Sequence, residues 1–315
     1  MGKKFTIGVL IGNVHTAHPK DLMRGIRAAA SGMDVNVIYF LGTQSVRFNQ
    51  KFALEDFDYQ YNTVYDYAKL AKVDVLIIAY GSLCIFQKNE DKQAFLDKFA
   101  GIPYVLLEDA TDDPRGIYVM VDNFGGMQKC VEHLIIEHHL KHLVYLGGPE
   151  DNQDAIERKA AFLNVMAEHH LPVTPEMMAV GDYSEFVDNL VEQLLKDNPD
   201  AEAIISANDE MTVACYRVCK AHGLRIGKDI LITGFDDVER ARYSNPPLTT
   251  VSQDAYKMGQ IAVEKAVDIC AGRPVESVRL DAELIIRESC GCKVTRRAKE
   301  KADETAKHLV QLGVY

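Results

Sequence analysis

Short apolar runs alternate with longer amphipathic stretches along most of this chain. The runs are rich in β-branched residues, and each is followed by a stretch in which apolar residues recur with a helical period. Nearly continuous apolar runs predict strands buried on both faces, as in a parallel sheet covered by helices. We therefore predict an α/β protein with doubly wound parallel sheets, whose strands include FTIGVLI (5–11), VNVIYF (35–40), VDVLIIA (73–79), IPYVLL (102–107), HLVYLG (142–147), EAIIS (202–206) and DILITGF (229–235).

These strands are too numerous for one small sheet. A further strand, Ile117–Val121, leads through Asn123 and two glycines into a new helix that continues to His138. The sequence contains no repeat, low-complexity tract or Pro/Gly-rich linker. We therefore expect two lobes that divide near this point and are joined by short crossing segments.

Polar residues follow the predicted strands at the points where the strands end. In open α/β sheets, ligands bind outside the carboxyl ends of the strands, because loops and helix N-termini converge there. The resulting rim is rich in hydrogen-bond acceptors and comes from both lobes, which suits a small polyol or a cationic molecule. Its members are Asn13, His15, Tyr80, Ser82, Glu108, Asp109, Asn208, Asp209, Asp236 and Asp237.

The sequence lacks the familiar catalytic motifs. It has no Gly-x-Ser-x-Gly elbow, Walker A loop, His-Glu-x-x-His motif or Gly-x-Gly-x-x-Gly fingerprint. Asp236 and Asp237 are adjacent, and neighbouring side chains at a strand end normally point in different directions, which does not suit a paired acid and base. We expect a binding protein with no enzymatic activity and no cofactor. One of the two aspartates would face a ligand and the other would cap the following turn or helix.

Composition and charge narrow the range of partners. The 315 residues are 47% hydrophobic and 26% charged, as in ordinary globular proteins, and the formal net charge is −11. This acidic balance argues against a general nucleic-acid or anionic-membrane surface. No apolar run approaches the roughly 20 residues that span a bilayer. We expect a cytoplasmic protein that contacts neither nucleic acid nor membrane.

The cysteines are odd in number, seven in all, which indicates buried thiols in a reducing compartment and not a disulfide framework. The Cys-Gly-Cys stretch at 290–292 is tighter than the usual zinc-knuckle spacing, and Cys215 and Cys219 stand at helical spacing. We therefore expect no metal site. The alternative is a site made by three neighbouring histidines, His138, His139 and His142.

Four longer motifs follow one another along the chain: VMVDNFGGMQKCVEHLI, ISANDEMTVACYRVCKAHGLRIGKDILITGFDD, PPLTTVSQDAYKMGQIAVE and ELIIRESCG. Together, and in this order, they resemble the effector-binding core of LacI/GalR-type regulators, a type I periplasmic-binding-protein fold, over roughly residues 5 to 291. The resemblance implies two lobes joined by three crossovers, a ligand in the cleft between them, and a hinge that closes on the ligand.

The resemblance also implies roles for individual residues. Arg158, within ERKAAF, matches the family's arginine that contacts ligand hydroxyls or carboxylates. Asn208 and Asp236 match polar contacts of the second lobe, Gln253 matches a polar residue at the cleft edge, and Tyr183 matches an aromatic wall. On this basis Asp236 accepts hydrogen bonds from the ligand, whereas Asp237 holds the loop that leads to PPLTT.

Several departures from the family pattern affect these expectations. The family's DNA-binding members carry a helix-turn-helix before the first strand, whereas KKFTIGVLI stands near the start here, so we expect no DNA reader in this chain. The first loop lacks the apolar pair that commonly lines a sugar pocket. Glu108 and Asp109 lie near the position of a usual arginine, which favours a more donor-rich or cationic ligand. His138 and His139 replace the usual Gly-His, and we expect His138 to adopt a left-handed conformation.

The last residues predict a further helix. Val294, Ala298, Ala302, Ala306 and Val310 recur at i, i+4, a stripe too weakly apolar to fold alone. We prefer a signalling helix that leads to an output module. The alternatives are a surface helix packed on its own lobe and a tetramerisation helix.

The predicted organisation therefore has three parts: residues 1–121 with 251–280, residues 122–250 with 281–292, and a C-terminal helix at 293–315. The preferred function is a sensor domain that binds a small polar effector in the cleft between the lobes and transmits hinge closure through the C-terminal helix to an output module such as a diguanylate cyclase or kinase. The alternative is the ligand-binding core of a LacI-family transcriptional regulator. In either case we expect a homodimer whose effector is a sugar, polyol, nucleoside or amine.

Overall fold

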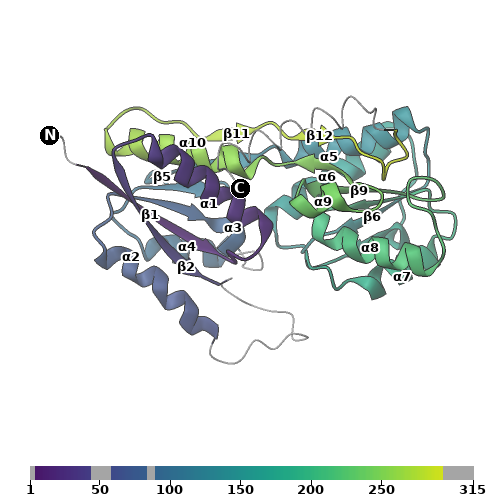
Figure 1. The fold of residues 1–315 in the computed structure, drawn as a ribbon, viewed down its shortest axis with the longest axis horizontal. Helices are drawn as coiled ribbons and strands as arrows, with labels where there is room; N and C mark the ends of the chain where they lie inside the picture. The colour runs from purple at the N-terminus through teal and green to yellow at the C-terminus, as the bar shows by residue number, and fades with distance from the viewer. Residues whose placement is uncertain (1–3, 44–57, 84–88, 294–315) are drawn as a thin grey trace.

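The computed structural model describes residues 4–43, 58–83 and 89–293, and all structural statements below concern these residues. They form two α/β lobes that lie side by side along the long axis of the molecule (Figure 1). This arrangement confirms the predicted fold class. The predicted helix at 293–315 lies, apart from residue 293, outside the described residues and stays a prediction.

The first lobe is built on a six-stranded sheet with the order β11-β5-β4-β3-β1-β2. All of its neighbouring strands are parallel. Four of the predicted runs and the strand predicted at 117–121 lie in this sheet, as expected from their continuous apolar character. The strands are β1 (Phe5–Gly12), β2 (Val35–Gly42), β3 (Val75–Ala79), β4 (Tyr104–Leu107), β5 (Gly116–Val121) and β11 (Val278–Leu280).

The second lobe repeats this plan with the order β12-β10-β9-β8-β6-β7. Its strands are parallel except for the pair β10 and β12, which is antiparallel. The other three predicted runs form β6, β8 and β9. The strands are β6 (Leu143–Gly147), β7 (Met178–Val180), β8 (Ala203–Ser206), β9 (Leu231–Asp236), β10 (Thr249–Ser252) and β12 (Glu283–Ile285).

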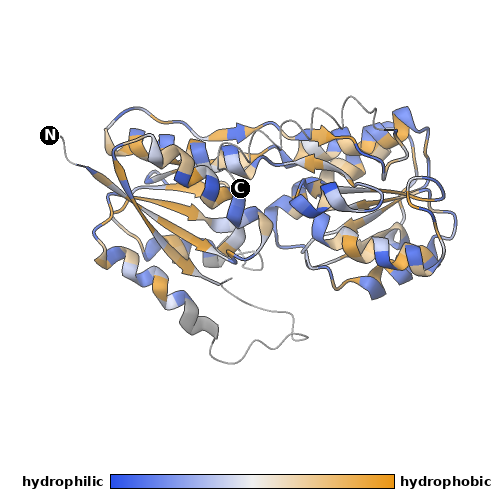
Figure 2. Ribbon diagram, in the orientation of Figure 1, coloured by the Kyte–Doolittle hydropathy of each residue, from blue (hydrophilic) through white to orange (hydrophobic). Residues whose placement is uncertain are grey.

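Helices cover both sheets, and Figure 2 shows their hydrophilic positions on the outside of largely hydrophobic strands. The α-helices are α1 (Ala17–Ser31), α2 (Tyr67–Leu70), α3 (Tyr80–Leu83), α4 (Asn89–Asp97), α5 (Asn123–Glu132), α6 (Gln153–Glu168), α7 (Asp188–Asp197), α8 (Asp209–Ala221), α9 (Glu239–Tyr243) and α10 (Ala255–Cys270). The 3-10 segments are η1 (Asp58–Asp66) and η3 (Pro175–Met177), and η2 (His133–Glu137) is a π-helical turn. None of the described helices is long and apolar enough to cross a membrane.

The chain crosses between the lobes at three places: after β5, between β10 and α10, and between β11 and β12. Two crossings touch directly, because the Asp122 N–H donates a hydrogen bond of 2.7 Å to the Leu280 carbonyl. β10 belongs to the second sheet, so the division predicted between residues 250 and 251 falls inside this strand. After β10 the chain re-enters the first lobe as α10, which packs along α1 (Figure 1).

One local expectation was wrong. His138 was expected in a left-handed conformation, but its φ is −105°. The left-handed residue is His139, with φ of 58°. The cause is the π-helical turn, whose wider i to i+5 hydrogen bonding extends the helical segment by one residue before the chain reverses.

Candidate ligand-binding site

Five charged or titratable side chains from the two lobes face one another, and we call them the interlobe cluster: His18, Glu108, Asp154, Arg158 and Asp236. The first two belong to the first lobe, on α1 and directly after β4. The other three belong to the second lobe, on α6 and at the end of β9. The charges of Asp154 and Asp236 both help to raise the pKa of His18, so the two halves lie within electrostatic range of each other.

Glu108 is the centre of the first-lobe half. Its backbone is left-handed, with φ of 68°, and only 7% of the residue is exposed. One carboxylate oxygen accepts a hydrogen bond of 2.9 Å from the Ser82 N–H, and the other is paired with Nε2 of His18. Gly81 leaves room for this carboxylate, because a Cβ at residue 81 would lie 2.6 Å from the Cβ of Glu108.

His18 carries a positive charge at neutral pH. Burial by itself would lower the pKa of His18, but the charge of Glu108, its hydrogen bond and the charges of Asp236 and Asp154 raise the pKa to about 9. The side chain is 22% exposed, so it is held in place and still reaches the space between the lobes. The pair therefore presents a fixed cation and a fixed anion side by side.

Arg158 organises the second-lobe half. It is 2% exposed, and its Nε and Nη1 donate to the Asn123 side chain at 2.8 Å and to the Ala207 carbonyl at 2.7 Å. Its guanidinium also lies over the ring of Phe235, 3.8 Å from the centroid. A buried guanidinium with this many partners is positioned rigidly, as a ligand-binding arginine needs to be.

Two carboxylates lie near this guanidinium. Asp154 is 3.8 Å and Asp236 is 3.6 Å from its nitrogens, longer than direct hydrogen bonds. Burial raises the pKa of Asp154 to about 6 against the opposing effect of Arg158. Burial likewise raises the pKa of Asp236. Each carboxylate also accepts a hydrogen bond within the protein, Asp154 from the Asn123 amide at 2.7 Å and Asp236 from the Gln253 amide.

Asp236 and Asp237 differ in their partners. Asp236 has an unusual φ of 122°, and its carboxylate accepts a hydrogen bond from the side-chain amide of Gln253. Asp237 is held by two arginines, Arg287 at 2.5 Å and Arg242 at 3.3 Å. Asp236 thus lies in the interlobe cluster, whereas Asp237 ties its loop to residues outside it.

Two further residues of the predicted rim, and the tyrosine implied by the family resemblance, lie in the second lobe. Asn208 is the N-cap of α8, accepting from the Met211 N–H at 3.0 Å, and its amide donates to the Tyr183 carbonyl at 3.2 Å. Tyr183 is left-handed, with φ of 66°, and its hydroxyl donates to Asn152 at 3.4 Å. Asp209 is buried and accepts from Thr250 and from the Val238 N–H, at 2.6 and 3.0 Å. These contacts shape the loops around the cluster.

The remaining predicted residues lie in different surroundings. Asn13 is left-handed and half-buried after β1, and His15 is exposed. Tyr80 is 4% exposed and packs edge-on against Phe95 in the core of the first lobe. Ser82 contributes its backbone N–H to Glu108, and Asp109 pairs with Lys92 at 2.7 Å. The structure therefore brings Glu108, Arg158, Asp236 and Gln253 together, but it places Tyr80 and Asp109 outside the cluster.

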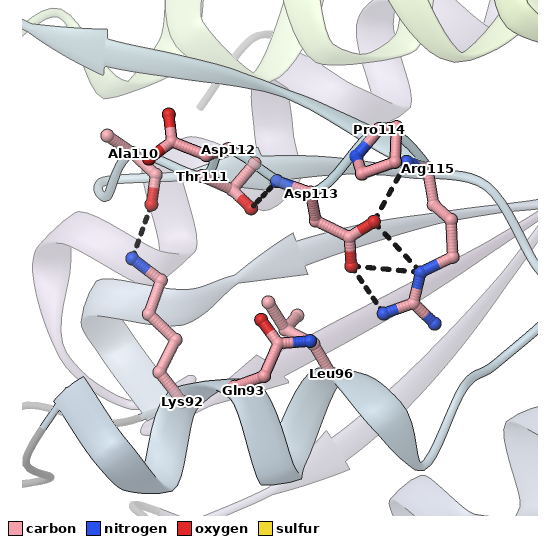
Figure 3. Close-up of a pocket in the computed structure, with 9 residues that line it drawn as sticks. All are labelled: Lys92, Gln93, Leu96, Ala110, Thr111, Asp112, Asp113, Pro114 and Arg115. Carbon is pink, nitrogen blue, oxygen red and sulfur yellow. Dashed lines mark hydrogen bonds and ion pairs between the residues drawn. The ribbon is translucent and has the colours of Figure 1, made fainter.

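A separate open depression lies on the first lobe, next to Asp109 (Figure 3). It is lined by α4 and the loop after β4, from Lys92 to Arg115. Three of the four charged side chains that line it are already paired, because Asp113 binds Arg115 and Lys92 binds Asp109. Since these pairs leave little charge for a ligand, we favour the interlobe cluster as the binding site.

Sequence reasoning missed His18, Asp154 and Asn123. His18 lies in the first turn of α1, and Asp154 and Asn123 lie in the first turns of α6 and α5. His18 and Asp154 do not directly follow a predicted strand, and Asn123 follows the strand predicted at 117–121 but leads into the next helix. The available signal was their place at helix N-termini, which also converge on the carboxyl ends of parallel strands.

A protein-family model, described as a periplasmic binding protein-like domain, matches residues 131–290, about half of the chain. Among curated proteins, the transcriptional regulator CelR of Thermobifida fusca is 30% identical over 216 residues, which are 66% of this chain and 62% of that protein. The repressor PurR of Aliivibrio fischeri is 29% identical over 61% of this chain and 56% of its own length. The chain thus spans less than two thirds of these relatives.

Solved structures give the same architecture. The complex of the transcriptional regulator CelR with cellobiose has a TM-score of 0.75 at 23% identity, over 91% of this chain and 85% of that one. A Lac repressor dimer bound to operator and an anti-inducer has a TM-score of 0.76 at 23% identity, over 92% and 82% of the two chains. At these identities the likeness concerns the fold.

Proposed function

The chain belongs to the periplasmic binding protein-like domain family, and from this premise we propose that it is the effector-binding core of a LacI-type transcriptional regulator. A small polar effector would bind between the lobes and favour their closure. The observation that carries this proposal is the interlobe cluster, because it brings buried charges from the two lobes together. The resemblance to regulators such as CelR supports the same reading.

The chemistry of the cluster indicates the class of effector. Three carboxylates and two cations line one space, so a ligand with many hydroxyl groups could both donate to Asp154 and Asp236 and accept from Arg158. We propose a sugar or polyol first, in keeping with the cellobiose complex of CelR. Nucleosides and amines are the other proposed effectors. Because carboxylates outnumber cations in the cluster, effectors with many hydrogen-bond donors are favoured.

The comparisons favour a transcriptional regulator over a sensor coupled to a diguanylate cyclase or kinase. The relatives named above are transcriptional regulators, and they are longer than the region that matches this chain. We also propose that the protein forms a homodimer, as the Lac repressor structure does. These statements about partners rest on the proposed function.

A thermal-shift screen of sugars, polyols, nucleosides and amines tests the binding proposal. A ligand at about 100 times its dissociation constant stabilises the folded state by about 2.7 kcal/mol, which raises the melting temperature by several degrees. The variant Arg225→Ala, which breaks an exposed ion pair with Asp229 in the second lobe, should keep this response. If no compound in the library shifts the melting temperature, the proposed effector classes are wrong.

A further inference from the structure

Two histidines and two cysteines converge on the second lobe, outside the interlobe cluster. We call them the His–Cys cluster: His133, His138, Cys290 and Cys292. Their ligand-type atoms all lie within 4.8 Å of one another. His133 and Cys290 are buried, whereas His138 and Cys292 are partly exposed. A metal ion could therefore reach the cluster from its exposed side.

The distances match a tetrahedral site. Nε2 of His133 is 3.2 Å from Nε2 of His138, and it is 3.4 Å from the Cys290 sulfur and 3.7 Å from the Cys292 sulfur. Nε2 of His138 is 3.4 Å from the Cys292 sulfur. Zinc bonds of about 2.0–2.1 Å to nitrogen and about 2.3 Å to sulfur give tetrahedral edges of roughly 3.3 Å for N···N and 3.6 Å for N···S. Each of these four separations agrees with its edge to within about 0.2 Å.

Two local features of the backbone build the cluster. The π-helical turn η2 (His133–Glu137) uses i to i+5 hydrogen bonding, which brings side chains five residues apart to the same side of the turn. Between the cysteines, Gly291 has φ of 84°, a left-handed conformation that reverses the chain so that both sulfurs approach the histidines. Cys292 is 159 positions from His133 and 154 positions from His138 in the sequence, and it contacts both.

The surroundings suit metal ligands. The Thr249 hydroxyl donates to the Cys290 sulfur at 3.1 Å, a type of outer contact that supports a thiolate. The charge of Glu137 acts on both histidines and adds negative charge beside the cluster.

We propose that the His–Cys cluster binds one zinc ion as a structural site. Two thiolates and two imidazoles form the donor set that zinc prefers in closed, four-coordinate sites. The ion would join the end of η2 to the Cys290–Cys292 segment, and so fix the last described residues of the chain to the second lobe. Four protein ligands leave no open position for a substrate, so the site would stabilise and not catalyse.

Metal analysis of the purified full chain tests this proposal. The protein is first stripped with a chelator, incubated with excess zinc and desalted, and its metal content is measured by mass spectrometry. We expect about one zinc per chain. Cobalt in place of zinc should give the absorption of a tetrahedral, thiolate-coordinated ion.

Variants identify the ligands. Cys292→Ser and His138→Gln, both at partly exposed positions, should each weaken zinc binding at least about 10-fold. Cys270→Ser, at a partly buried cysteine on α10 in the first lobe, should bind zinc like the original protein. Equal zinc binding by all of these proteins would overturn the proposal. The wild-type cobalt spectrum decides the question even if a variant fails to fold, because the absence of thiolate-to-cobalt absorption would also contradict it.

Discussion

Asp236 and Asp237 are neighbours in sequence with different surroundings. If Asp236 binds the effector, Asp236→Asn should remove charge-assisted hydrogen bonds of about 1.5–3 kcal/mol, which corresponds to roughly 10- to 150-fold in affinity. The fold should lose little stability, because the amide keeps an oxygen for the Gln253 side chain. Titration calorimetry with a ligand from the screen measures the change.

Asp237→Asn is the matched control. Its carboxylate pairs with Arg287, and the two side chains are only 9% and 14% exposed. The substitution should therefore cost about 1–3 kcal/mol of unfolding free energy and leave the affinity nearly unchanged. Equal affinity losses in the two variants would mean that the roles of the two aspartates are assigned wrongly.

The pair His18–Glu108 predicts a dependence of stability on pH. The pKa of His18 is about 9 in the folded protein and 6.5 when unperturbed. Because the folded value is the higher one, the pair stabilises fully below pH 6.5, and this contribution is lost as the pH rises through 9. Its size is on the order of 3 kcal/mol.

Denaturant melts at several pH values check this prediction. Between pH 6.5 and 9.5 the original protein should lose more unfolding free energy than His18→Gln, which cannot take up the proton. Parallel profiles for the two proteins would show that the proton on His18 does not stabilise the fold.

Residues at the ends of strands could be predicted from sequence, but their partners could not. Glu108 and Asp236 follow apolar runs, so parallel topology places each of them at the carboxyl edge of its own sheet. His18 has no such signal, because its importance comes from a contact with a residue 90 positions away. Tyr80 also follows a predicted strand, but its side chain is buried in the core of the first lobe.

At the scale of elements, α1 and α10 pack with almost no space between their backbones. A Cβ at Gly25 would lie 1.9 Å from the Tyr256 carbonyl oxygen, and one at Gly259 would lie 2.4 Å from the Leu22 carbonyl oxygen. The two glycines therefore set the distance between the helices. This contact joins the N-terminal part of the chain to the segment that returns from the second lobe.

Gly25→Ala should push these helices apart and cost about 1–3 kcal/mol of unfolding free energy. Gly32→Ala is the control, because a Cβ at residue 32 would come no closer than 3.6 Å to any neighbour. Chemical denaturation of both variants measures the difference. Similar stabilities would mean that the backbones adjust to the added methyl group without cost.

Elements with long apolar runs were predictable, whereas short ones were not. β7, β10, β11 and β12 have only three or four residues each, and they exist because neighbouring strands supply their partners. The His–Cys cluster was also missed. The spacing of Cys290 and Cys292 argues against a zinc site, but η2 and Gly291 bring distant histidine and cysteine side chains together in a way that local spacing does not reveal.

At the scale of the whole molecule, three crossings connect the two lobes. An ion pair of 3.0 Å between Arg279 of β11 and Glu157 of α6 joins the lobes near one crossing. The interlobe cluster lies where a ligand would touch both lobes, so ligand binding and lobe closure are coupled in the proposed function. A ligand that touched only one lobe would not favour closure.

The crystal structure of the protein with the most strongly stabilising compound from the screen tests this account most directly. We predict electron density for the compound between the lobes, in contact with Arg158 or Asp236 on one side and with His18 or Glu108 on the other. Density in the depression near Lys92 and Arg115, or on one lobe alone, would contradict the proposed interlobe site.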